Sequence, residues 1–402
     1  MARGVLGRGM QSRVDILDPA FRADPYPHYA ALRRDSPVTQ VEPGGMWAVS
    51  RHDDIVAVLR DPARFSSQAF RAVWEPAWVG YNPLARSILA MDGPGHARLR
   101  AVAGRSIGPR AVARLEPAIR RRADELAATL TGETEIVESF AAPLPAFVIA
   151  TLLGLDPALG VRFKRWADDF LSITPEPQDA AHAARVRATI AELSAYMHAV
   201  IAERRRAPID DMVSELLRPD ADGQTMTDAE VLEFMIVILL GGLETTTHLL
   251  ATSTVYLADH PDLWARLRAE PAKIAAFVEE MLRFDGPSQT LPRVTTCAVE
   301  LAGVTIPAGS LVLALVGSAG RDEHKFADPD RFDLDRGTAA LNFGHGVHFC
   351  LGAALARMEA QIGLGALVRR FSAISRVPGP LEYNRTMTVR GPVAARLCLT
   401  PA

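Results

Sequence analysis

The sequence is poor in cysteine, which excludes a disulfide-stapled scaffold. Its three cysteines, Cys297, Cys350 and Cys398, are far apart and odd in number. Disulfide-rich secreted domains use even sets of closely spaced cysteines. We therefore expect a reducing compartment, or an unpaired thiol with a function.

The sequence also lacks an excess of charge and a long apolar run. Its 44 basic and 47 acidic residues leave a net charge of −3, so no basic surface is available for a nucleic-acid backbone. The most apolar stretch, Phe234 to Leu243, is too short for a bilayer, which needs about 20 residues. The first residues carry arginines but no apolar segment typical of a secretory signal. We expect a cytoplasmic monomer that binds neither nucleic acid nor membrane.

No internal repeat, low-complexity segment or linker divides the chain. We predict a loose tail at 1–12 and one domain at 13–402. Alternation and turn residues predict strands and helices in separate runs, which favours an α+β fold that is mainly α-helical, rather than alternating strands and helices. The predicted strands are 47–50, 294–306 and 310–314; the predicted helical segments are 52–62, most of 109–260, and about 351–371.

The most informative segment is the loop 343–352, Phe-Gly-His-Gly-Val-His-Phe-Cys-Leu-Gly, which precedes an alanine-rich helix. Glycine allows positive φ and the close approach of a flat ligand to the backbone. Cys350 stands at the start of the helix, where unpaired N–H groups and the helix dipole favour a thiolate. An anionic sulfur held by N–H donors is suited to be the axial ligand of an iron.

Two other interpretations of Cys350 are weaker. A lone cysteine is most often a small buried hydrophobic residue, but the spaced glycines and flanking histidines argue against this. His345, His348 and Cys350 also offer zinc ligands, yet zinc sites usually need a further pair such as Cys-x-x-Cys, which the sequence lacks. We predict that Cys350 is the metal ligand of a haem.

The loop resembles the haem-binding signature of the cytochrome P450 family, Phe-Gly-x-Gly-x-His-x-Cys-x-Gly, at every fixed position. The resemblance implies that haem b lies between a long central helix and the Cys350 loop with its helix. It implies that Phe343 and Gly344 belong to the haem-binding loop. Four further motifs in the family's order extend the similarity over nearly the whole chain.

Four basic residues are candidates to bind the haem propionates. His96 and Arg100 stand four apart and share a helix face, while Arg293 follows Leu-Pro and His348 lies in the cysteine loop. The resemblance implies that all four are charge-assisted donors to the two propionates. Each residue taken singly is about equally consistent with an ordinary surface base.

Glu280 and Arg283 stand three apart and can pair on one helix face. Such a pair is usually a surface bridge of little energetic value. The resemblance adds Arg331 of Pro-Asp-Arg-Phe and implies a structural network of the three residues behind the haem. One departure from the family's pattern is the segment 320–322, Gly-Arg-Asp, where asparagine is expected before the arginine.

A capping box at Thr227 to Glu230 predicts a long helix to about Ala258. Its centre, residues 241–246, reads Gly-Gly-Leu-Glu-Thr-Thr. Two glycines cost about 1 kcal/mol each relative to alanine, and Thr245 can bond back to the carbonyl of Gly241. Strain concentrated here suggests function, although a glycine can also let another helix approach.

This segment is similar to the family's oxygen-binding groove, Ala/Gly-Gly-x-Asp/Glu-Thr. The resemblance implies a monooxygenase that inserts one atom of O2 into a C–H or C=C bond. Thr245 is then expected to supply a hydroxyl that holds a water, and Glu244 to relay protons from solvent.

The expected substrate pocket is largely apolar, with hydroxyls and one amide. We expect a hydrophobic substrate resembling a natural product, such as a polyketide, terpenoid, steroid or aromatic compound. Aromatic residues at Phe70 to Tyr81 are no less consistent with core packing, and Arg385 suits either carboxylate recognition or solvent. The candidate pocket residues are Trp74, Trp78, Val237, Leu240, Gly241, Gln289, Thr290, Leu291 and Met387.

The sequence contains no flavin or nicotinamide fingerprint. Electrons ultimately from NAD(P)H are therefore expected through a separate ferredoxin or flavodoxin and its reductase, with Arg98, Arg105 and Arg357 as a candidate docking patch. The alternatives are a haem-thiolate peroxygenase or isomerase, which needs no redox partner, and a haem-binding sensor or carrier without turnover. The Glu244–Thr245 pair argues against both, because neither needs a proton relay.

Overall fold

The computed structural model describes residues 14–68, 71, 74–174, 177–219, 223–337 and 340–402. The predicted tail at 1–12 and Phe70 lie outside the described residues. The helices are α1 (Pro19–Ala23), α2 (Tyr26–Asp35), α3 (His52–Arg60), α5 (Gly93–Ser106), α6 (Pro109–Thr129), α7 (Pro143–Leu153), α8 (Gly160–Leu171), α9 (Ala180–Arg206), α10 (Met212–Leu217), α11 (Asp228–Asp259), α12 (Pro261–Ala269), α13 (Ile274–Asp285), α14 (Val316–Ala319) and α15 (Ala353–Arg370). The strands are β1 (Val38–Val41), β2 (Met46–Val49), β3 (Phe65–Ser66), β4 (Gly132–Glu135), β5 (Leu291–Thr295), β6 (Val299–Leu301), β7 (Val304–Ile306), β8 (Leu311–Ala314), β9 (Phe371–Arg376) and β10 (Arg396–Pro401).

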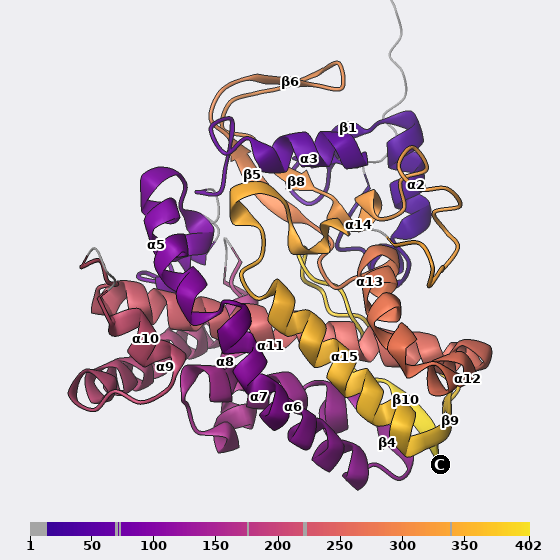
Figure 1. Ribbon diagram of the computed structural model, residues 1–402. Helices are drawn as coiled ribbons and strands as arrows, with labels where there is room; N and C mark the ends of the chain where they lie inside the picture. The colour runs from indigo at the N-terminus through magenta and orange to yellow at the C-terminus, as the bar shows by residue number, and fades with distance from the viewer. Residues whose placement is uncertain (1–13, 69–70, 72–73, 175–176, 220–222, 338–339) are drawn as a thin grey trace, which may run out of the picture.

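A five-stranded sheet joins distant parts of the chain. Its order is β1-β2-β8-β5-β3, with β2 parallel to β8 and β5 antiparallel to β8. In Figure 1 this sheet lies with α2 and α3 at the top, above a larger part made of helices. The predicted α+β fold, mainly α-helical, is confirmed, as are the strands before α3 and on either side of the Pro307–Gly309 turn.

The strand β4 was not predicted, because its sequence lies within a segment expected to be helical. Gly132–Glu135 pairs antiparallel with β10, so that Glu133 lies opposite Cys398. Its residues, Gly-Glu-Thr-Glu, carry no apolar alternation. The strand forms because a distant strand supplies its hydrogen-bond partners.

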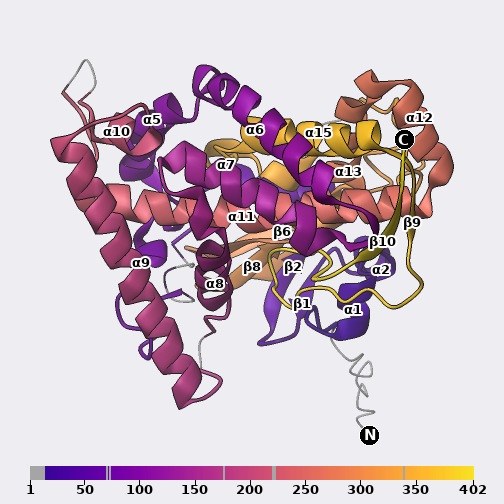
Figure 2. The same ribbon diagram turned by 90° about the horizontal axis from the view of Figure 1, so that it is seen from below.

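The helix α11 crosses the whole molecule, with α6 and α15 on one side and β1, β2 and β8 on the other (Figure 2). It begins with the predicted capping box, in which Thr227 N donates to Glu230 Oε2 (2.9 Å) and Glu230 N donates to Thr227 Oγ1 (3.3 Å). Its length and composition alone would suit a membrane span, but 72% of its apolar window is buried within the fold. We therefore assign α11 as the core helix.

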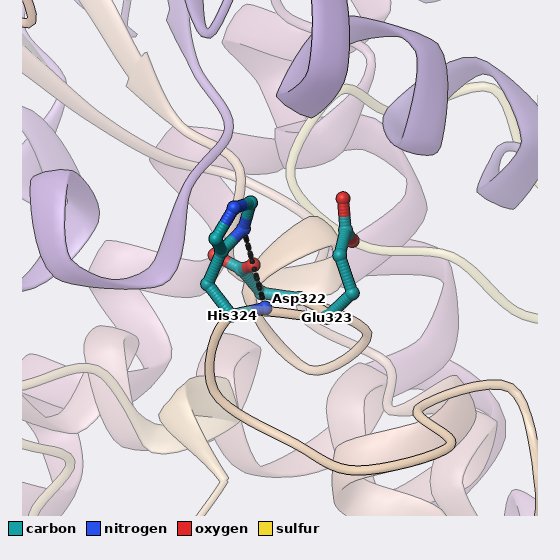
Figure 3. Close-up of side chains that lie close together, drawn as sticks. All are labelled: Asp322, Glu323 and His324. Carbon is teal, nitrogen blue, oxygen red and sulfur yellow. Dashed lines mark hydrogen bonds and ion pairs between the residues drawn. The ribbon is translucent and has the colours of Figure 1, made fainter.

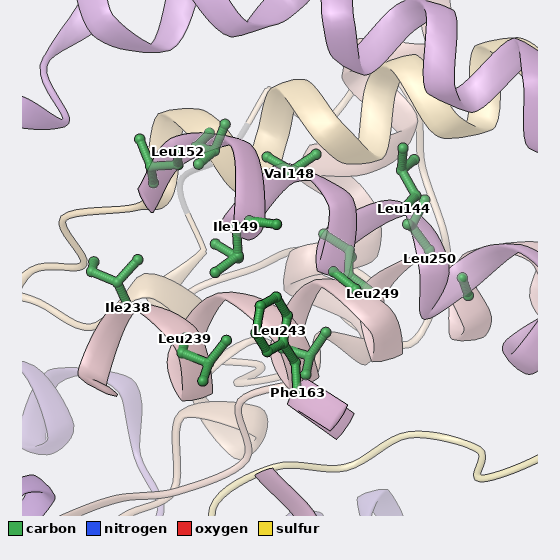
Figure 4. Packing of buried hydrophobic residues seen from close by; sticks show 14 of the residues in the cluster. Leu144, Val148, Ile149, Leu152, Phe163, Ile238, Leu239, Leu243, Leu249 and Leu250 are labelled. Atoms are coloured by element: carbon green, nitrogen blue, oxygen red, sulfur yellow. The ribbon is translucent and has the colours of Figure 1, made fainter. Parts of the chain in front are cut away.

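Gly242 lets α7 pack directly against α11. A Cβ at this position would lie 2.4 Å from Cδ1 of Ile149, which is closer than real Cβ contacts. Figure 4 shows Ile149 and its neighbours on α7 facing Leu239, Leu243 and other apolar side chains of α11. The packing explanation for a glycine therefore holds at Gly242. Gly241 is exposed, and a Cβ there would meet nothing within 4 Å. Helix packing therefore does not explain the glycine at position 241.

Candidate active site

The cysteine loop is shaped by two glycines in the left-handed region. Gly344 has φ +74° and Gly346 has φ +71°. A side chain at Gly346 would also collide with α3, because its Cβ would lie 2.8 Å from the carbonyl oxygen of Leu59. The N–H of Cys350 donates to the carbonyl of Phe343 (2.9 Å), which closes the loop in front of α15. The glycine spacing therefore has the backbone role that the sequence predicts.

The thiol of Cys350 lies where donors and cations converge. Burial raises its pKa, and this effect outweighs the lowering by backbone N–H groups of Gly352 and Ala353 and by the Arg100 and Arg357 guanidinium groups. The N–H groups at the start of α15 therefore act on the pKa of the thiol in the predicted direction, towards the thiolate. Metal ligation requires the deprotonated sulfur, so a bound cation would supply the stabilisation that the protein groups leave incomplete.

Two of the predicted propionate donors lie side by side. The rings of His96 and His348 have centroids 4.2 Å apart. Burial, with smaller effects from the neighbouring His348 and Arg100, lowers the pKa of His96 to about 4. An anion beside these rings would offset the cost of charging them.

Arg293 is the clearest sign of an anionic ligand. It is buried on β5, and burial lowers its pKa to about 10. Among the described residues no carboxylate forms an ion pair with it, and its side chain donates to the carbonyl of Pro292 (2.8 Å). Buried charges are normally paired, so this guanidinium fits a carboxylate that the protein itself does not provide.

Sequence reasoning missed Asp92, which organises this cluster. Its Oδ2 accepts hydrogen bonds from Ser66 Oγ (2.6 Å) and Ser67 N (2.9 Å), and its Oδ1 lies 3.0 Å from Nε2 of His348. Burial favours a higher pKa for Asp92, but these hydrogen bonds outweigh it and lower the pKa. Asp92 precedes α5 without a side-chain capping bond, and its partners come from distant segments, so no local signal in the sequence identified it.

Arg100 lies close to the cysteine, where its charge acts on the Cys350 thiol. Its guanidinium donates to the carbonyl of Phe349, the residue before Cys350. The donor set thus consists of a thiol, two neighbouring histidines whose rings are tilted by 47°, and two guanidinium groups around the cysteine loop. This chemistry fits haem, with Cys350 for the iron and His96, Arg100, Arg293 and His348 for the propionates.

On the α11 side, Thr245 bonds back to its own helix as predicted. Its Oγ1 donates to the carbonyl of Gly241 at 2.6 Å. The hydroxyl proton is therefore committed, while the oxygen keeps lone pairs that can accept a hydrogen bond. Thr247 makes the same bond to Leu243 (2.7 Å) but is buried, so Thr245 is the half-exposed member of the pair.

Glu244 does not point freely into solvent. Its Oε1 lies 3.3 Å from Nδ2 of Asn384 and 3.6 Å from Nε2 of His248. Neither partner was predicted. The spacing of Glu244 and His248, four residues on one helix, is a signal that could have identified the histidine. Asn384 comes from the C-terminal segment and had no such signal.

The predicted structural network needs one correction. Glu280 and Arg283 form a buried two-point ion pair, at 2.7 and 2.8 Å. Arg331 contributes its carbonyl to Arg283 (3.2 Å), but its guanidinium is largely exposed and pairs with Asp333. The second arginine beside Glu280 is Arg336, whose Nε lies 3.3 Å from Oε1 of the carboxylate. The prediction for the Arg331 side chain is wrong because the loop carries Arg336, five residues later, inward instead.

The candidate pocket residues fall into different environments. Gln289 is fully buried, and its amide accepts from Tyr29 (3.1 Å) and donates to Gly286 (2.9 Å), so it is held within the fold and was wrongly assigned to the pocket. Thr290 donates to the carbonyl of Met387 (3.1 Å) and is likewise buried.

The remaining candidates are packed to different degrees. Trp78 donates to the carbonyl of Thr174 (3.0 Å), which ties it to the end of α8. Val237 and Leu240 are buried in the core, and Trp74 is partly buried against it. Leu291 and Met387 are partly buried against a second apolar cluster.

Asp322, Glu323 and His324 lie together in a loop (Figure 3), but their atoms are already used. Asp322 accepts from the backbone N of His52 (2.7 Å) and of His324 (2.9 Å), and Glu323 pairs with Arg33 (2.9 Å). The group holds the start of α3 in place. Beside it, Arg321 lies over the rings of Tyr26 and Phe284, 3.6 Å from each centroid. At the departure from the family's pattern, a Cβ on Gly320 would lie 2.1 Å from the carbonyl oxygen of Arg283, so the close backbone approach there requires glycine.

Arg98 and Arg357, which were proposed for docking, each form an ion pair within the chain. Arg98 pairs with Glu230, and Arg357 pairs with Glu279 (3.1 Å for the longer of two contacts) while lying over the ring of Phe343. Their positive charge is therefore partly neutralised within the chain.

Comparison with known proteins agrees with this chemistry. The family model described as cytochrome P450 matches residues 167–399. Among curated relatives, the erythromycin C-12 hydroxylase of Saccharopolyspora erythraea is 40% identical over 86% of both chains. The cyclomarin C epoxidase CymV of Salinispora arenicola is 39% identical over 91% of this chain and 93% of its own.

Solved structures match over nearly the full length. Cytochrome P450 CYP109Q5 from Chondromyces apiculatus has a TM-score of 0.90 at 38% identity and covers 97% of this chain and 99% of its own. A mutant of P450 EryK in complex with erythromycin B has a TM-score of 0.85 at 36% identity and covers 95% and 98%.

Proposed function

Because this chain belongs to the cytochrome P450 family and is a haem-dependent monooxygenase that uses O2, we propose that it hydroxylates or epoxidises a hydrophobic natural product. The relatives named above act on erythromycin and cyclomarin, according to their names. The observation that carries the site assignment is the convergence of the Cys350 thiol with the His96–His348 pair and with buried Arg293, which has no ion pair within the part of the chain that the structure describes. Bound haem b supplies the activation of O2 for which the family is known.

The chain's own groups have separate tasks in this proposal. Cys350 holds the iron, and the basic residues hold the propionates. Thr245 offers an oxygen that accepts a hydrogen bond beside the reaction site. Glu244, which lies beside His248 and Asn384, transfers protons from solvent to that site. Exposed Gly241 leaves open space on α11 where a side chain would otherwise stand.

The electron supply and state of the protein complete the proposal. We infer that a ferredoxin or flavodoxin with its reductase delivers electrons from NAD(P)H, and that the enzyme is a soluble cytoplasmic monomer, one domain over 13–402. The buried position of the apolar helix α11 supports solubility.

One reconstitution distinguishes the proposed activity from its alternatives. The haem-loaded protein is mixed with a surrogate ferredoxin, its reductase and NADPH, and hydrophobic metabolites that displace water from the iron are added. Ligand-dependent NADPH consumption with an oxygenated product supports the monooxygenase. Turnover only with added hydrogen peroxide would indicate a peroxygenase, and binding without any turnover would indicate a sensor.

Thr245→Val tests the role of the hydroxyl, with Thr247→Val as the matched control. Both threonines make the same back-bond, so both substitutions remove the same helix contact. Thr245→Val should keep substrate binding but lower product per NADPH by about 10²-fold, with hydrogen peroxide released instead. If both variants formed the same amount of product per NADPH, Thr245 would have no role in the reaction.

A further inference from the structure

The acid of the proposed relay is docked between two partners. The Glu244 and His248 side chains are 16% and 8% exposed, and Nε2 of His248 lies 3.6 Å from Oε1 of Glu244. Nδ2 of Asn384 lies 3.3 Å from each of these two atoms. A carboxylate this buried needs such partners, so its resting position is set by them rather than by solvent.

The orientation of Asn384 is fixed by donors on its other side. Its Oδ1 accepts from Arg22 Nη2 and from the backbone N of Gly391, both at 3.2 Å. The amide nitrogen must therefore face Glu244 and His248. Arg22 is buried on α1 and also donates to the carbonyl of Val389 (2.6 Å). His248 and Asn384 together form a dock for the Glu244 carboxylate. Through Arg22 this dock joins α1, α11 and the C-terminal segment.

The imidazole of His248 is held tightly yet is incompletely satisfied. Gly391 presses against the ring, since a Cβ there would lie 2.3 Å from Cγ of His248. Nδ1 of His248 is buried and has no hydrogen-bond partner among the described residues. Buried polar atoms are nearly always paired. Since the Asn384 amide donates, Nε2 of His248 accepts that hydrogen bond, and the ring proton stands on Nδ1. His248 therefore holds Asn384, and through it Glu244, while its own Nδ1 stays without a partner among the described residues.

We propose that His248 is a positioning residue for Glu244. Together with Asn384 it forms the dock from which the carboxylate turns towards Thr245, and it thereby sets how efficiently protons reach the reaction site. The inference rests on the proposed role of Glu244. It adds a residue of this chain, one helical turn from the acid, to the relay.

The test uses the haem-loaded enzyme with two variants that disturb the dock differently. His248→Phe keeps the ring's bulk but removes both nitrogens. Gly391→Ala keeps the histidine and displaces its ring. Ser253→Ala is the control, because Ser253 is a buried α11 residue whose Oγ is also unpaired and which makes no contact in the dock. His248→Gln restores a polar group of similar reach.

Both dock variants should bind substrate as the natural protein does but release about tenfold more hydrogen peroxide per product, and His248→Gln should recover part of the coupling. Crystal structures should show the Glu244 carboxylate away from Asn384 in His248→Phe. If His248→Phe releases as little hydrogen peroxide per product as the unmodified enzyme, while Glu244→Gln releases more, the role of His248 is overturned. Natural coupling in Glu244→Gln, or no turnover by the unmodified enzyme, would instead refute the proposed function.

Discussion

Nε2 of His348 lies 3.0 Å from Oδ1 of Asp92, which links the cysteine loop to the residue before α5. The same carboxylate collects hydrogen bonds from Ser66 and Ser67, at β3. Three chain segments that are distant in sequence therefore meet at one side chain. Because the rings of His348 and His96 are in contact, with centroids 4.2 Å apart, Asp92 fixes the position of both histidines of the propionate-binding set.

Asp92→Ala should weaken haem retention. The substitution leaves His348 without its charged partner and the N–H of Ser67 without an acceptor, and a hydrogen bond to a charged group is worth about 1.5–3 kcal/mol. Transfer of haem to an excess of apo-globin should therefore be about tenfold faster than in the unmodified enzyme. An unchanged transfer rate would show that Asp92 does not support the site.

Cys350→Ser should abolish thiolate ligation. Serine cannot replace the sulfur as an anionic ligand at neutral pH, so the carbon monoxide complex of the reduced protein should lose the red-shifted Soret band typical of thiolate-bound haem. Cys398→Ser, at an exposed cysteine on β10, is the control and should leave the spectrum unchanged. A retained band in Cys350→Ser would disprove the ligand assignment.

The neighbouring glycines of α11 should respond oppositely to alanine. Gly242→Ala forces a Cβ against Ile149 and should lower the free energy of unfolding by about 1 kcal/mol or more. Gly241→Ala meets open space and should raise it by about 0.5–1 kcal/mol through helix propensity. Urea denaturation of both variants measures the difference. The same sign for both would contradict the close contact between Gly242 and Ile149.

Arg336 and Arg331 should differ in their effect on stability. Arg336→Met removes a guanidinium that is 10% exposed and lies beside buried Glu280, so unfolding should become easier by about 2–4 kcal/mol. Arg331→Met removes a side chain that is 66% exposed, and should change stability by less than about 0.5 kcal/mol. Denaturation midpoints of the two proteins decide whether Arg336 is the inward arginine.

Glu233 should make stability depend on pH. Burial, with repulsion from Glu230, raises the pKa of this carboxyl on α11 to about 7. The folded chain therefore holds a proton that the unfolded chain releases, and this stabilisation is complete below about pH 4.5 and is lost as the pH rises through 7. Glu233→Gln should be more stable than the unmodified protein by about 1–3 kcal/mol at pH 8. At pH 5, urea unfolding should show a much smaller difference in the free energy of unfolding between the two proteins. An equal difference at pH 5 and pH 8 would contradict the raised pKa of Glu233.

The sequence alone determined the cysteine loop, the capping box of α11, the back-bond of Thr245 and the pairing of Glu280 with Arg283. These features depend on residues close together in the chain, where glycine conformations and helical spacing leave few alternatives. For the same reason the sequence identified the family's fold.

Only the tertiary structure decided which distant groups meet. Asp92, Asn384 and Arg336 reach their partners through contacts between separate segments, and β4 exists only because β10 pairs with it. Burial and long-range pairing depend on how elements pack together, and local spacing carries no information about that packing.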